Sequence, residues 1–239
     1  MRKFSLPSLL IGISLACIAS AAPAMGILRA DDNLVMYGKV LPEDLSAFEQ
    51  ELTHGDVHTI IFANSPGGDL KSAYGIAKLI KEMHINTAVQ GHCASSCAVM
   101  FMAGTVRQMV GGGAQKTRLG FHGPHKKDSK AVSTHGIPKL REWLMQASGE
   151  KFPPELLDKA MYIEKANDMM LFYYPDGNAN SVWFCPEGSK PRPTACEKMP
   201  GYDALSAGIL TTATLLDTGA IPVKTDTRQM SQQEKTEIE

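Results

Sequence analysis

Apolar and polar positions in the first hundred residues alternate with the periods expected of strands and helices. Weak alternation over Leu34–Val40 predicts a strand, and the apolar run Thr59–Ala63 predicts a buried strand. Pro42 opens a predicted helix between these strands. A second helix follows, with an apolar face formed by Ala73, Ile76, Ala77 and Ile80. After the next short strand, Thr87–Val89, the alternation as a whole predicts an α/β fold with parallel strands.

In the second half of the chain, the sequence pattern predicts a short strand, a helix and an inserted hairpin. Leu119–His122 predicts a short strand that ends on a histidine. A later helix is predicted to begin at Pro153-Pro154 and to run through Asp168 to about Phe172. Residues 176–200 are rich in Gly, Pro and Asn, and they predict an inserted hairpin.

Length and charge narrow the class of protein. A chain of 239 residues suits one domain, which we place at residues 25–224. The net charge of −1 gives no reason to expect nucleic acid or an anionic membrane as the main partner. Residues 225–239 are polar, and we predict that they form a disordered tail.

The N-terminus has the three parts of a secretory signal peptide. Arg2 and Lys3 give it a basic start, Leu6–Ile18 is apolar, and small residues ending at Ala21 and at Ala24 provide two cleavage sites. We therefore predict a signal peptide over residues 1–24 and a periplasmic or secreted protein. The apolar run is too short for a comfortable permanent anchor, so we expect no stable membrane span after processing.

Four cysteines remain once cleavage of the signal peptide has removed Cys17. In an exported chain they predict two disulfides, and proximity in sequence favours Cys93–Cys97 and Cys185–Cys196. The second pair would staple the insert at residues 176–200. The alternative is a metal site of Cys93 and Cys97 with His92, but no distant His or Cys cluster completes it. We therefore expect neither a metal nor a cofactor.

Three segments resemble the Clp protease proteolytic subunit and its crotonase-like relatives. They are Asn64-Ser65-Pro66-Gly67-Gly68, Gly91–Gly104 and Phe121-His122-Gly123-Pro124, which are similar to the family's oxyanion loop, nucleophile segment and catalytic-histidine segment. The resemblance covers about Leu34–Leu216. It implies a repeated β-β-α spiral, with Tyr202–Gly208 as a late helix that leads into a last strand.

The resemblance also implies a role for each site residue. Ser95 would be the nucleophile, His122 its base and Asp168 the acid that orients the base. The backbone N–H groups of Gly68 and Ser96 would form the oxyanion hole, and Gly67 would let a substrate approach the backbone. The alternatives are Ser96 as nucleophile, His125 as base, and Asn167 or Asp158 as the orienting group. The base is expected to titrate near neutrality.

The function implied is that of a periplasmic, ATP-independent serine peptidase that uses a Ser-His-Asp triad on polypeptide substrates. The absence of ATP in that compartment means that no ATP-driven unfoldase would assist it. Two other classes stay open: a crotonase-like enzyme acting on a thioester, and a catalytically silent scaffold or binding protein that retains the fold. The resemblance also allows a homo-oligomer.

Overall fold

The computed structural model describes residues 24–112, 117–126, 131–175, 181–186 and 196–218. Nearly all of the predicted signal peptide and the whole predicted tail at residues 225–239 lie outside these ranges. Part of the predicted insert, residues 176–180 and 187–195, also lies outside them.

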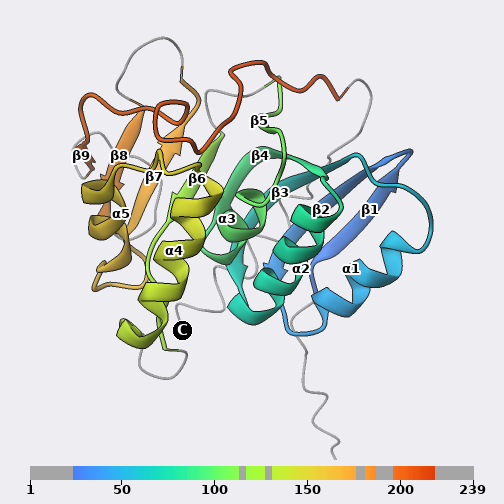
Figure 1. Ribbon diagram of the computed structural model, residues 1–239, viewed down its shortest axis with the longest axis horizontal. Coiled ribbons are helices and arrows are strands. Elements are labelled where there is room, and N and C mark those ends of the chain that lie inside the picture. The colour runs from blue at the N-terminus through green and yellow to red at the C-terminus, as the bar shows by residue number, and fades with distance from the viewer. Residues whose placement is uncertain (1–23, 113–116, 127–130, 176–180, 187–195, 219–239) are drawn as a thin grey trace, which may run out of the picture.

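Among the described residues, nine strands form one sheet (Figure 1). Their order is β1-β2-β3-β4-β6-β7-β8-β9, and β5 pairs with β4. The parallel centre is formed by β2 to β6, while β1 and β7 to β9 pair antiparallel to their neighbours. The bounds are β1 Gly26–Ala30, β2 Asn33–Val40, β3 Thr59–Gly68, β4 Asn86–Ala94, β5 Arg107–Met109, β6 Arg118–Phe121, β7 Met169–Tyr173, β8 Val182–Cys185 and β9 Glu197–Lys198.

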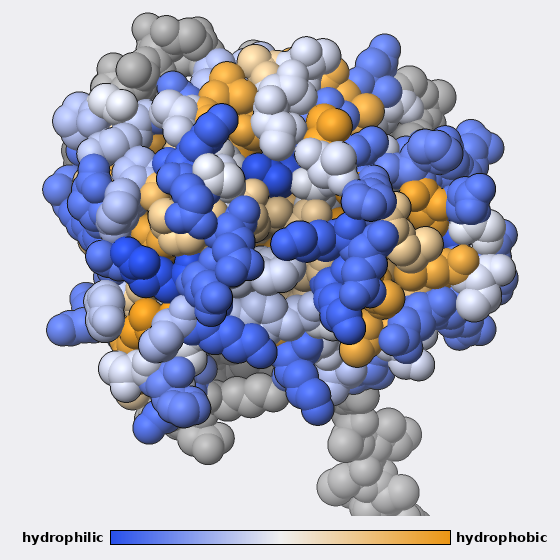
Figure 2. Space-filling view, viewed as in Figure 1, coloured by the Kyte–Doolittle hydropathy of each residue, from blue (hydrophilic) through white to orange (hydrophobic). Residues whose placement is uncertain are grey.

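Helices pack on one face of this sheet. Figure 1 shows α1 to α4 in front of the strands, and their outer surfaces are mostly hydrophilic in the same view (Figure 2). The bounds are α1 Asp44–Leu52, α2 Leu70–Glu82, α3 Ser96–Phe101, α4 Ile137–Ala147 and α5 Pro154–Met161. A short 3₁₀ turn, Thr134–Gly136, precedes α4. In the described ranges, no helix combines the length and apolar character needed to cross a membrane.

The period-2 pattern of the central strands divides the core into two parts. Ile60 and Phe62 of β3 belong to the main cluster between the sheet and the helices, whereas Ile61 and Ala63 belong to a smaller cluster on the opposite face. All four side chains are fully buried. A strand buried on both faces appears as a continuous apolar run in sequence, which is why Thr59–Ala63 could be predicted as a buried strand from sequence alone.

The α/β fold with parallel central strands is confirmed, but one predicted helix is wrong. The helix from Pro154 ends at Met161, and residues 169–173 form β7 between β6 and β8. Asp168 therefore lies directly before a strand, not within a helix. A five-residue apolar run fits a buried strand or a helix equally well, and only the pairing partners decide between them.

Two other boundaries also differ from the prediction. The predicted late helix at Tyr202–Gly208 is a series of turns, and an isolated bridge between Val110 and Leu216 replaces the last strand. The predicted hairpin in the insert is confirmed in its described part, where β8 pairs with β9 and the disulfide joins Cys185 to Cys196. The first strand, Gly26–Ala30, was not predicted.

Candidate active site

The nucleophile candidate lies on a sharp turn between β4 and α3. Ser95 has φ 57° and ψ −125°, a backbone conformation that residues with a Cβ rarely adopt. Its amide donates to the carbonyl of Gly120 on β6 at 2.9 Å, which ties the turn to the sheet. A strained strand-to-helix turn of this kind projects the serine hydroxyl from the end of the sheet.

The neighbouring serine is in a different environment. Ser96 begins α3, the residue is only 2% exposed, and within the described structure its Oγ is buried without a hydrogen-bond partner. Its hydroxyl cannot reach a substrate without movement of the turn. The first N–H groups of a helix have no intrahelical acceptor, so its backbone suits an oxyanion donor.

The end of β3 packs directly on the serine turn. Gly67 has φ +86°, and a Cβ there would lie 2.5 Å from the Ala94 carbonyl oxygen and 2.9 Å from the Ser95 Cβ. Its amide donates to Ser65 Oγ at 3.3 Å. At Gly68, with φ +151°, a Cβ would collide with the Val40 carbonyl oxygen. Only glycine fits at these two positions, and at Gly67 its lack of a side chain lets the backbone of β3 contact the serine turn directly.

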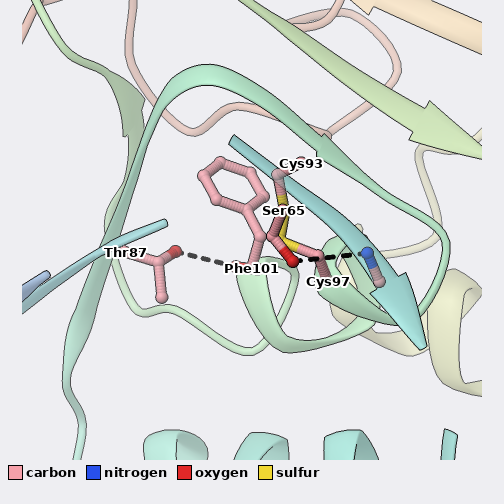
Figure 3. Close-up of a disulfide and its surroundings, with 6 residues drawn as sticks. Ser65, Thr87, Cys93, Cys97 and Phe101 are labelled. Carbon is pink, nitrogen blue, oxygen red and sulfur yellow. Dashed lines mark hydrogen bonds between the residues drawn. A yellow bond between two sulfur atoms is a disulfide. The ribbon is translucent and has the colours of Figure 1, made fainter. Parts of the chain in front are cut away.

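The Cys93–Cys97 disulfide joins the two sides of the serine turn. It joins the end of β4 to α3, and both cysteines are fully buried. Figure 3 shows Ser65 beside the bridge, in agreement with the strand register that pairs Ser65 with Cys93. The prediction of two disulfides is confirmed, and the alternative of a metal bound by Cys93, Cys97 and His92 is wrong because both sulfurs are used. Within the described ranges no group of three or more His, Cys, Asp or Glu could hold a metal.

One cavity of about 490 Å³ joins these features. The end of β3, the serine turn, the segment after β6, helix α4 and the loop before β7 all contribute to its walls. The predicted site residues that line it are Gly67, Gly68, Ser95, Ser96 and His122. Two of the alternatives, His125 and Asn167, line it as well.

The candidate base follows directly after β6. Burial lowers the pKa of His122 to about 4; repulsion between the two imidazoles when both are protonated adds to this shift, and a backbone hydrogen bond at Gly123 opposes it. The expectation of titration near neutrality is therefore wrong for this histidine. At neutral pH its imidazole is uncharged, which is the state that accepts a proton from a serine.

The Nδ1 nitrogen of His122 contacts another histidine. The His122 Nδ1 lies 3.1 Å from the Nδ1 of His125. Asp168 precedes β7, is 9% exposed, and donates its amide to the Lys165 carbonyl at 2.9 Å; it is not among the described residues that line the cavity. Asp158 forms an ion pair with Arg141 at 2.7 Å on the surface.

The contact between the two histidines is the feature that sequence reasoning missed. His125 was considered only as a replacement for His122, because it follows Pro124 and lies outside the strand. The sequence signal was a second histidine three residues after the first, on the far side of a Gly-Pro turn.

Part of the chain matches a known protein family. Residues 35–127, less than half of the chain, match the family model described as Clp protease. The matched span contains the glycine turn, Ser95 and His122, and it ends before Asp168. No curated protein sequence matches the chain. Among solved structures, a mutant of ClpP1 from Listeria monocytogenes is similar at 16% sequence identity and a TM-score of 0.49, covering 78% of this chain and 92% of that chain.

Proposed function

We propose that this chain, whose fold is that of the Clp protease and crotonase-like superfamily, is a serine peptidase that works outside the cytoplasm without ATP. One observation carries the proposal. The serine at the strained turn, its adjacent glycine turn and a neutral buried histidine line the same cavity. A strained strand-to-helix turn that carries a serine at the wall of a cavity is typical of a nucleophile, which favours the peptidase over a silent scaffold.

The proposed reaction is acyl transfer to serine followed by hydrolysis. Ser95 Oγ attacks the carbonyl carbon of a peptide bond while His122 takes its proton, and the backbone N–H groups of Gly68 and Ser96 stabilise the oxyanion. His122 then gives that proton to the leaving amine. Water, deprotonated by the same imidazole, releases the acyl group and regenerates the serine.

Labelling with a fluorophosphonate probe tests this function on the folded, oxidised protein. We expect peptide mapping to place the label on Ser95, and Ser95→Ala to abolish it. Ser96→Ala is the matched control and should label normally, because its buried Oγ takes no part in the reaction. Loss of either Ser95 or His122 should lower turnover on the order of 10⁶-fold. A folded wild type that stays unlabelled, or Ser95→Ala that labels equally well, would leave the silent-scaffold alternative.

Export is the second part of the proposal. Two disulfides suit an oxidising compartment, and with no ATP-driven unfoldase there the substrates would be unfolded or flexible polypeptides. A homo-oligomer, which the resemblance allows, stays a prediction.

The predicted cleavage can be read from the mature N-terminus. If cleavage follows Ala24, the new amino group belongs to Met25, whose nitrogen lies 3.0 Å from the Oδ1 of buried Asp44. That amino group would form an ion pair with the Asp44 carboxylate. N-terminal sequencing of the protein from a periplasmic fraction should begin at Met25 after this cleavage, or at Ala22 after cleavage at Ala21. A retained Met1 in the membrane fraction would refute cleavage and favour a permanent anchor.

A further inference from the structure

The two histidines of the cavity contact each other through one defined pair of nitrogens. The Nδ1 atoms of His122 and His125 lie 3.1 Å apart, with ring centroids 5.0 Å apart. The other nitrogen of His125, Nε2, lies 3.0 Å from the backbone carbonyl oxygen of Ile163. His122 is therefore in contact with His125, and His125 is in turn held by a backbone carbonyl group.

The chemistry of these partners determines where the protons lie. A carbonyl oxygen can only accept, so His125 Nε2 carries a proton, and a neutral imidazole carries only one. The Nδ1 of neutral His125 is then a bare acceptor, and His122 must donate to it from its own Nδ1. That leaves the Nε2 of His122 without a proton, which is the form required of a general base.

Backbone contacts hold the segment that carries both rings. The amide of Gly123 donates to the Ala160 carbonyl at 2.9 Å, and a Cβ at Gly123 would collide with the carbonyl oxygen of Met161. The Pro124 carbonyl accepts from the Ser133 amide at 2.7 Å. The Gly123-Pro124 turn therefore packs against the end of α5, close to the Ile163 carbonyl that accepts from His125.

From these contacts we propose that His125 is a positioning residue, which holds the His122 ring and its Nδ1–H tautomer so that the site is Ser95-His122-His125. The proposal rests on the proposed peptidase function for its effect on rate, although the tautomer can be measured without activity. The Nδ1 of His122 carries one proton and has one partner, so Asp168 cannot take the same place while His125 holds it.

Two substitutions of His125 separate positioning from a merely structural role. His125→Asn places an amide oxygen near the position of Nδ1 and keeps an acceptor for His122. His125→Gln places an amide N–H near the position of Nε2 and keeps the donor to Ile163, but loses that acceptor. If His125 positions His122, Asn should preserve the rate of labelling within a few-fold, and Gln should lower it on the order of 10²-fold. That loss is smaller than the ~10⁴-fold expected when an orienting carboxylate is lost, because an imidazole nitrogen has no negative charge with which to stabilise the imidazolium that forms on His122.

The opposite order, with Gln active and Asn impaired, would show that His125 only anchors the loop to Ile163, and it would overturn the proposal. Equal rates for both variants would overturn it too. Asp168→Asn serves as the comparison: a loss larger than that of His125→Gln would assign the orienting role to Asp168. Thermal unfolding of each variant, followed by circular dichroism, confirms that the compared proteins are folded.

The tautomer provides a readout that does not depend on catalysis. In ¹⁵N-detected histidine spectra at neutral pH, we expect His122 of the wild type and of His125→Asn to carry its proton on Nδ1. In His125→Gln the proton should move to Nε2. If the wild type fails to label at Ser95, the peptidase function is refuted, and the spectra still decide the positioning role. A wild-type His122 protonated on Nε2 would overturn the proposal whatever the labelling result.

Discussion

Gly67→Ala tests whether the close approach of β3 to the serine turn is essential. The added Cβ would lie 2.5 Å from the Ala94 carbonyl oxygen, 2.8 Å from the Ser96 nitrogen and 2.9 Å from the Ser95 Cβ. None of these atoms is the end of a flexible side chain, so the two segments must move apart. The substitution also places alanine at φ +86°, which L-residues disfavour.

The expected cost has two parts that a matched control separates. Gly38 has nearly the same backbone angle, φ +89°, but nothing lies within 4 Å of a Cβ built on it. Gly38→Ala should therefore cost only the conformational penalty, about 1–2 kcal/mol of unfolding free energy. Gly67→Ala should add an overpacking cost of about 1–3 kcal/mol, for a total of about 2–5 kcal/mol.

Function should respond more sharply than stability. A displacement of about 1 Å at a reacting group can lower the rate on the order of 10²-fold, so Gly67→Ala should slow labelling of Ser95 by about that factor. Urea unfolding under non-reducing conditions measures the free energies, and the time course of fluorophosphonate labelling measures the rate. If Gly67→Ala and Gly38→Ala cost the same within about 0.5 kcal/mol and label equally fast, the close contact has no consequence and the reasoning fails.

Two further predictions concern the disulfides and the response to acid. With sequence separations of 4 and 11, replacing both cysteines of Cys93–Cys97 by alanine should cost about 2 kcal/mol, and replacing those of Cys185–Cys196 about 3 kcal/mol. Only loss of the Cys93–Cys97 disulfide should also slow labelling of Ser95. If loss of either disulfide changes the labelling rate equally, Cys93–Cys97 has no special effect on the serine turn. Burial lowers the pKa of His92 and of His122 to about 4, with Arg118 adding to the shift of the first and His125 to that of the second. Between about pH 6.5 and pH 4 the unfolded chain therefore binds more protons, so the unfolding free energy should fall as pH falls through this window, and His92→Gln should reduce the slope; an unchanged slope would refute the shift at that residue.

Sequence alone determined the features that depend on local pattern. The buried strand Thr59–Ala63 and the helix after it follow from the period of their apolar residues, and this information is carried by each segment separately. The disulfides were readable because each joins cysteines close in the chain. Small residues around Ser95 indicated a tight turn, although its positive φ became evident only in the structure.

Tertiary structure decided whatever depends on partners far away in the chain. Residues 169–173 form a strand because they pair with β6 on one side and with β8 on the other, and the five residues by themselves do not reveal these partners. The same applies to His125, whose role depends on the Ile163 carbonyl reached across 38 positions of sequence. Local propensity describes what a segment can do alone. Which hydrogen-bond partner a buried imidazole finds is set by the packing of the end of α5 against the turn after β6, and packing is a property of the whole fold.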